Sequence, residues 1–100
     1  MNTGILKSKV QEAISEIDDA LNRGLFTVAR EGYPIDYELR YILGELHRID
    51  DELTERRVPP KAQRMFGIGR IILDTWWKYD KEPLAEKLLF ISYAYLRKLP

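Results

Sequence analysis

Apolar residues recur every three or four positions along most of the chain, which is the spacing of one buried face of an α-helix. The first such stripe, from Leu6 to Val28, predicts a helix over residues 4–31, with a break at Gly24 as the alternative. Asn2 or Thr3 supplies a side-chain oxygen that can cap its first turn. The first third of the chain is therefore expected to be helical.

Three further stripes follow, and each is bounded by proline. The second is the most regular, and its predicted core positions are Leu39, Ile42, Leu46, Ile49 and Leu53. The predicted helices run from Asp36, as N-terminal cap, to Arg57, from Pro60 to Tyr79, and from Pro83 to Leu99. Gly69 falls on the buried stripe of the third helix and would allow a second backbone to approach closely.

Four helices joined by short loops favour antiparallel neighbours. We therefore predict an all-α fold, an antiparallel up-down four-helix bundle, or five helices if Gly24 breaks the first. No segment shows the sustained alternation of a strand. A length of 100 residues matches a single domain over residues 1–100.

Most aromatic side chains fit these stripes. Trp76 lies on the third stripe and Trp77 lies about 90° from its centre, so we expect both in the core. Phe90 and Tyr93 lie off the fourth stripe and are candidates for a second contact surface. The oligomeric state stays open.

Composition removes many kinds of chemistry. The chain has no cysteine, and no apolar run approaches the roughly 18 residues of a membrane span. The first residues show no apolar signal segment, which favours a cytoplasmic location. The single histidine, His47, has Asp50 and Asp51 nearby on its helix, too few ligands for a typical zinc site. We expect no metal and no cofactor.

Catalytic motifs are equally sparse. No serine lies in a Gly-x-Ser-x-Gly turn, and Gly67-Ile68-Gly69 lacks the third glycine of a dinucleotide fingerprint. Residues 17–23 are similar to the opening helix of helical chorismate mutases, which would imply a small enzyme that grips a dianion with basic side chains. We predict no enzyme and keep that family as an alternative.

Charge is divided unevenly, although sixteen basic and sixteen acidic residues give zero net charge. Residues 1–55 hold twelve acids against six bases, and residues 56–100 hold ten bases against four acids. One basic stretch contains no acid and could neutralise phosphates of a nucleic acid: Arg56, Arg57, Lys61, Arg64 and Arg70. Nucleic-acid binding is therefore an alternative function.

The acidic half carries a second candidate surface. On a helical wheel with Leu39 at 0°, Tyr37 and Tyr41 fall at about 160° and 200°, opposite the buried stripe. Tyrosine is enriched among residues that dominate binding energy, and surrounding acids would steer a basic partner. The candidate partner-binding residues are Tyr37, Tyr41, Glu45, Arg48, Asp51, Glu52 and Glu55.

A small, neutral, cysteine-free helical chain with an acidic tyrosine-bearing face resembles bacterial toxin-immunity proteins of the bacteriocin and contact-dependent growth inhibition types. The residues that carry the resemblance are Tyr37, Tyr41, Glu45, Asp51, Glu52 and Glu55. It implies a non-catalytic inhibitor that docks on a basic, nuclease-type toxin domain, since an acidic face can occlude a groove built for nucleic acid. The expected partner is therefore a protein.

Overall fold

The computed structural model describes residues 2–100, and within them the chain is helical, with no strand. The four helices are α1 (Thr3–Asn22), α2 (Asp36–Thr54), α3 (Ile68–Thr75) and α4 (Pro83–Tyr93). A short 3₁₀ turn precedes α3 at Lys61–Gln63, and a π-helical turn at Ala94–Lys98 continues α4. The all-helical prediction is confirmed.

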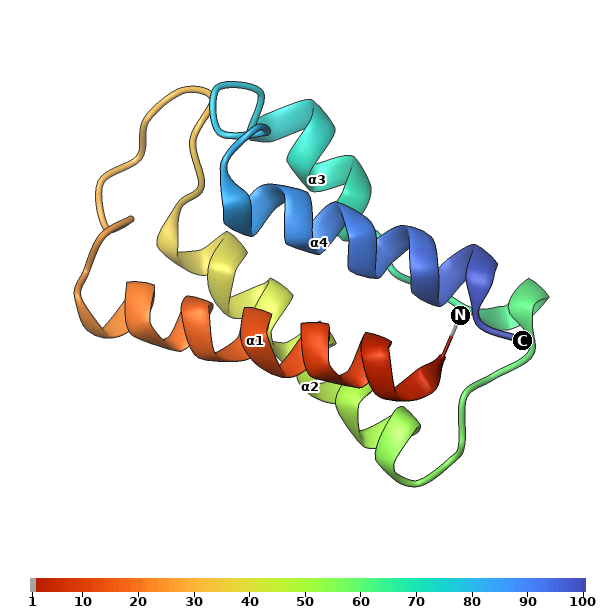
Figure 1. The fold of residues 1–100 in the computed structure, drawn as a ribbon. Coiled ribbons are helices and arrows are strands. Elements are labelled where there is room, and N and C mark those ends of the chain that lie inside the picture. The colour runs from red at the N-terminus through yellow and green to blue at the C-terminus, as the bar shows by residue number, and fades with distance from the viewer. Residues whose placement is uncertain (1) are drawn as a thin grey trace.

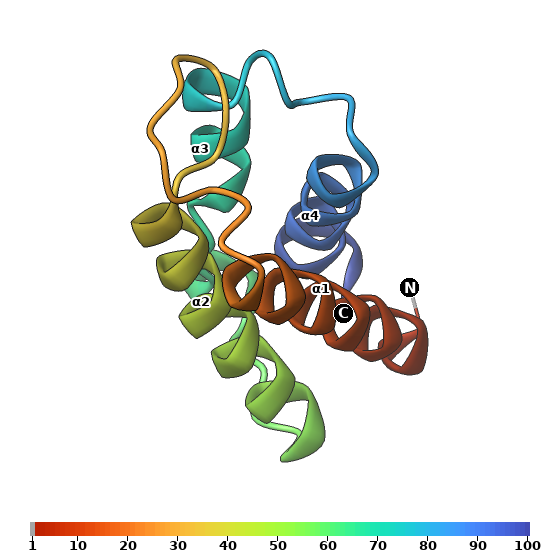
Figure 2. The ribbon, with the colours of Figure 1, turned by 90° about the vertical axis from the view of Figure 1, so that its left-hand side faces the viewer.

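The helices form two layers, one of α1 and α4 and the other of α2 and α3 (Figures 1 and 2). Lys7 Nζ in α1 donates to Thr54 Oγ1 at 2.6 Å, so the beginning of α1 lies beside the end of α2. In Figure 1, α1 crosses in front of α2 at an oblique angle. The arrangement is therefore four packed helices of unequal length, 20, 19, 8 and 11 residues.

One hydrophobic core joins the four helices, and the predicted stripes supply most of it. All five predicted core positions of α2 are buried, as are Leu6, Val10, Ala13 and Ile17 of α1. The largest fully buried side chains are Trp76 and Tyr95. Burial of Trp76 confirms its predicted place on the third stripe. Trp77 is a correction, because 49% of its surface is exposed and its ring stacks with the Lys78 ammonium at 4.9 Å.

The first helix ends at Asn22, well before the predicted residue 31. Gly24 adopts a left-handed φ of 65°, and the Leu25 amide donates back to the Ala20 carbonyl, which closes the helix. The break predicted at Gly24 is therefore correct, but no fifth α-helix follows it within the described residues. Val28, expected on the stripe, is 69% exposed.

The segment after Gly24 packs through different residues than the stripe predicts. Phe26, which does not lie on that stripe, is partly buried and packs edge-to-face on Tyr79 at 5.5 Å. Gly32, at a φ of 83°, accepts the Lys78 amide at 2.8 Å through its carbonyl, so the connection before α2 is tied to the connection after α3. The second helix also begins differently, since Ile35 rather than Asp36 occupies the cap position.

The third helix is the largest departure from prediction. It covers Ile68–Thr75, whereas the stripe predicted Pro60 to Tyr79. Met65, within that predicted span, is 78% exposed, and the chain there is not helical. Gly69 behaves as predicted, since a methyl group at its Cα would lie 3.2 Å from Ser92 Oγ of α4. The two backbones are therefore close at this point.

Candidate functional site

Two exposed tyrosines mark the outer side of α2. Tyr37 is 70% exposed and Tyr41 is 51% exposed, one helical turn apart. Leu39 and Ile42, on the opposite face of the same helix, are fully buried. The apolar stripe thus fixes the helix in the core and leaves both phenol rings in solvent. We call the predicted set of Tyr37, Tyr41, Glu45, Arg48, Asp51, Glu52 and Glu55 the tyrosine face.

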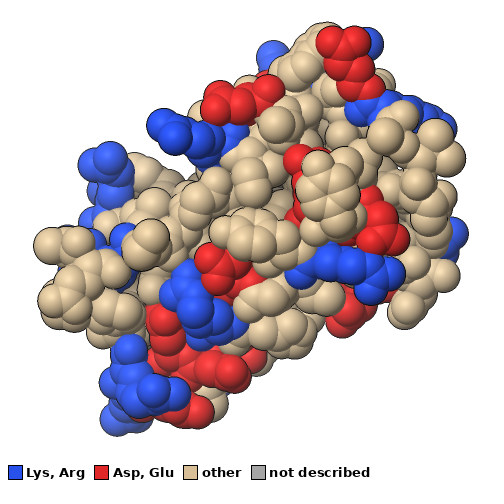
Figure 3. All heavy atoms as spheres, turned by 180° about the vertical axis from the view of Figure 1, so that it is seen from behind, with Lys and Arg blue, Asp and Glu red and all other residues tan. Residues whose placement is uncertain are grey.

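The side of the molecule formed by α2 and α3 carries a band of uncharged surface between groups of acidic and basic side chains (Figure 3). The two helices meet where Glu38 of α2 accepts hydrogen bonds from Trp76 Nε1 at 3.0 Å and from Thr75 Oγ1 at 3.3 Å. These bonds fix the beginning of α2, so Tyr37, the preceding residue, is presented from an anchored turn.

Arg48 organises the middle of the tyrosine face. Its guanidinium donates to Glu45 at 2.9 Å, to Glu52 at 2.8 Å and to the backbone carbonyl of Met65 at 2.7 Å. These contacts, the hydrogen bond to Glu45 first, hold the pKa of Arg48 above its usual range. Arg48 therefore stays charged and offsets one of the two carboxylates that it joins.

Glu52 requires a correction, because it is not part of an exposed acidic rim. Its side chain is 15% exposed and accepts the phenol proton of Tyr95 at 2.6 Å. Tyr95 is fully buried, and burial followed by the bond to Glu52 raises its pKa. The sequence places Tyr95 on the fourth buried stripe but gives no signal for its partner 43 residues away.

The other acids of the face differ in how exposed they are. Glu55 lies beyond the last turn of α2 and pairs with Arg57. Asp51 is exposed, and within residues 2–100 it forms no ion pair. His47 is also exposed on α2. Glu45 is 23% exposed and held by Arg48, so the accessible acidic charge comes mainly from Asp51 and Glu55, and the rim is narrower than the sequence predicts.

The predicted basic stretch does not form one accessible patch, since Arg64 at its centre is 8% exposed. The Arg64 guanidinium donates to four backbone carbonyls, those of Pro59 at 2.7 Å, Tyr95 at 2.8 Å, Leu99 at 2.7 Å and Pro100 at 2.8 Å. These four bonds occupy N–H donors of Arg64 that would otherwise be available to a phosphate. Arg56, Arg57, Lys61 and Arg70 are exposed, and Arg57 is paired with Glu55.

Two arginines also converge on one ring, the kind of cluster that a helical enzyme would need. The guanidinium carbons of Arg48 and Arg64 lie 6.0 and 5.8 Å from the centre of the Tyr95 ring. Both groups are occupied by the carboxylates and carbonyls named above, so neither presents a free fork of donors to a dianion. The geometry gives no support to the chorismate-mutase alternative.

Metal ligands are not gathered anywhere in the part of the chain that the structure describes, where no three His, Asp or Glu side chains are placed to hold an ion. Nor does any helix over residues 2–100 have the length and apolar character needed to cross a membrane.

The chain was compared with protein-family models, curated proteins and solved structures, and none of these comparisons gave a match.

Proposed function

We propose that this protein is a non-catalytic inhibitor that binds a partner protein through the tyrosine face. The most specific form of the proposal is an immunity protein of the bacterial cytoplasm that neutralises a basic, nuclease-type toxin domain. The observation that carries it is the exposure of Tyr37 and Tyr41, one turn apart, on a helix whose other face is fully buried. Large aromatic side chains held in solvent cost solubility unless a partner covers them.

The rigidity of α2 supports the proposal. Five buried side chains hold the helix in the core, and Arg48 connects its outer side to Met65 and to Tyr95 in the π-helical turn after α4. A tyrosine has few rotatable bonds, so presenting two of them from a fixed backbone keeps the entropy lost on binding small. Binding energy from the rings is then retained as affinity.

We also propose that the four helices form an up-down bundle, in which each helix runs antiparallel to the next. Such packing would help to keep α2 rigid. Lys7 joins the beginning of α1 to the end of α2, and Glu38 joins the beginning of α2 to the end of α3. Gly69 lies against Ser92 near the end of α4. In each of these three contacts, the beginning of one helix lies beside the end of the next, as antiparallel neighbours require.

Charge favours a basic partner. Glu45, Asp51 and Glu55 lie within about four turns of Tyr41 on the same helix or just beyond its end. Arg48 and Arg57 offset part of this charge, so the face is net acidic but weakly so. Electrostatic attraction would then speed association, while the tyrosines supply most of the affinity.

The experiment compares binding of the wild type and of the double variant Tyr37→Ala, Tyr41→Ala to the toxin domain encoded by the adjacent reading frame, by isothermal titration calorimetry. Truncating a tyrosine that dominates an interface costs about 2 kcal/mol or more, so we expect the double variant to bind at least ~100-fold more weakly. Its stability in urea should change by less than about 1 kcal/mol, because both rings are exposed.

A matched control changes the other exposed aromatic pair, Phe90→Ala with Tyr93→Ala on α4, which are 38% and 50% exposed. This variant should bind the partner as the wild type does. The proposal is refuted if the wild type does not bind the neighbouring gene product. It is also refuted if the α4 variant, rather than the α2 variant, loses affinity.

A further inference from the structure

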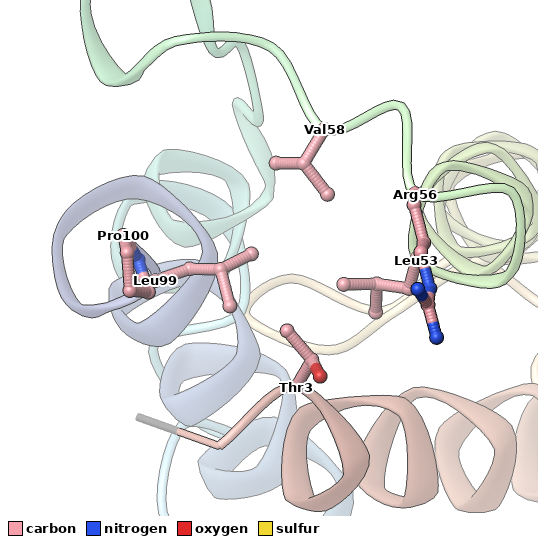
Figure 4. A pocket seen from close by; sticks show the side chains of 6 residues that line it. All are labelled: Thr3, Leu53, Arg56, Val58, Leu99 and Pro100. Atoms are coloured by element: carbon pink, nitrogen blue, oxygen red, sulfur yellow. The ribbon is translucent and has the colours of Figure 1, made fainter.

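A pocket of about 380 Å³ opens at the end of the molecule where α1 begins and α2 ends. Its lining comes from three separate parts of the chain: Thr3, Leu53, Arg56, Val58, Leu99 and Pro100. In Figure 4, the side chains of Leu53, Val58 and Leu99 point toward its centre. The volume lies at the lower end of the range of small-molecule sites, and the walls combine these three aliphatic side chains with polar groups.

Arg56 occupies a strained position at the edge of this pocket. Its φ is 55°, and it is the one non-glycine residue with a positive φ among residues 2–100. It follows the cap residue Glu55, and the amide of Arg57 donates to the Glu52 carbonyl at 2.8 Å, which is the helix ending that glycine usually completes. A glycine here would relieve the strain, so Arg56 is unfavourable for the backbone.

The Arg56 side chain also makes no polar contact that would offset this strain. Over residues 2–100 it makes no hydrogen bond and no ion pair, whereas Arg57 and Arg64, which follow it in the chain, are both engaged. Strained residues concentrate at binding sites, where the side chain has a use that outweighs the backbone cost. The position of Arg56 therefore points to a ligand at the pocket.

The charges around the pocket favour an anion. Arg56 is the charged side chain among the six that line it. The positive end of the α1 dipole lies at Thr3, and the ammonium of Lys7 is held nearby on Thr54. The adjacent acids are engaged elsewhere, Glu52 by Arg48 and Tyr95 and Glu55 by Arg57.

We propose that this pocket binds a small aliphatic carboxylate. Arg56 pairs with the carboxylate, and Leu53, Val58 and Leu99 enclose the hydrocarbon chain. At roughly 30 Å³ for each water-sized atom, the cavity holds about a dozen non-hydrogen atoms, which is the size of a medium-chain fatty acid. The pocket shares no residue with the tyrosine face, so this proposal is independent of the proposed function.

The test is a titration of methyl-labelled protein with octanoate, followed by NMR. We expect saturable shifts confined to the methyl groups of Leu53, Val58 and Leu99. Octan-1-ol has the same chain without the charge, and acetate has the charge without the chain. Each should bind at least about tenfold more weakly than octanoate, because each lacks one half of the recognition.

The matched variants are Arg56→Asn and, away from the pocket, Arg70→Asn on the exposed side of α3. Asparagine tolerates a positive φ, so the first removes the charge without new backbone strain. It should weaken octanoate binding about tenfold or more, whereas Arg70→Asn should not change it. Arg56→Lys keeps a positive charge, so its affinity for octanoate should lie between that of the wild type and that of Arg56→Asn.

Three results would overturn the proposal. The first is no saturable shift at the pocket methyls with millimolar octanoate. The second is equal affinity for octanoate and octan-1-ol, which would reduce the pocket to an apolar surface. The third is an affinity in Arg56→Asn equal to that of the wild type.

Discussion

Replacing Arg64 by methionine is expected to destabilise the protein strongly, although sequence alone marks Arg64 as a surface cation. Methionine keeps an apolar stem of similar length but removes every donor. Four carbonyls then lose their partner, and those of Tyr95 and Leu99 lie at buried contacts with Arg64. A hydrogen bond to a charged group contributes about 1.5–3 kcal/mol, so the two buried ones alone predict a loss of about 3–6 kcal/mol.

This loss is large relative to the whole fold. A 100-residue domain is stable by about 5–15 kcal/mol, so Arg64→Met should unfold at a much lower urea concentration. The melting temperature should fall by more than about 12 °C, at 4–8 °C for each kcal/mol. Fluorescence of Trp76, which is fully buried, reports the transition. The stability of Arg64→Lys should lie between that of the wild type and that of Arg64→Met, since an ammonium has three donors where the guanidinium has five.

The control is Arg57→Met. Arg57 has a 67% exposed side chain and pairs with Glu55, so its loss should change stability by less than about 0.5 kcal/mol. If Arg64→Met unfolds within about 1 kcal/mol of the wild type, water satisfies these carbonyls equally well. The role assigned to Arg64 would then be wrong.

Two further predictions concern backbone strain and pH. Gly32→Ala should destabilise the protein by about 1–2 kcal/mol, because φ is 83° and the new methyl group would meet Lys78 at 2.8 Å. Gly44→Ala is its control and should stabilise α2 by about 0.5–1 kcal/mol, since nothing lies within 4 Å; urea unfolding measures both. Above pH 10, stability should fall, because the folded state holds the Tyr95 proton that the unfolded state releases at the ordinary pKa. Tyr95→Phe should remove the corresponding part of the phenolate absorbance titration above pH 10 and flatten the pH dependence. If the phenolate titration of Tyr95→Phe equals that of the wild type, the raised pKa assigned to Tyr95 and its hydrogen bond to Glu52 would be wrong.

The regular part of the fold can be predicted from the sequence because the information is local. In α2, every position from Leu39 to Leu53 at steps of three and four is buried, and the outward direction of Tyr37 and Tyr41 follows from the same geometry. The ion pairs of Arg48 with Glu45 and Glu52 have the spacing of neighbours on a helix surface. Their place on one helix is enough to predict them.

The rest depends on contacts between distant residues. Periodicity alone cannot show that Val28 lies outside the core, because the chain stops being helical at Gly24 and the stripe then has no physical meaning. Arg64 is buried by carbonyls 31–36 residues away, and backbone carbonyls are the same in every residue. The strain at Arg56 is similarly invisible, since glycine rather than arginine is the usual signal for that conformation.

The ion pairs of Lys87 in α4 with Glu12 and Glu16 in α1 have a consequence for the order of folding. They join residues 75 and 71 positions apart, whereas the bonds between α1 and α2 span 47 and 39 positions. Contacts between near neighbours in sequence form faster than distant ones. The α1–α2 hairpin and the α3–α4 unit are thus expected to form first, and the seam between α1 and α4 is the last part of the molecule to close.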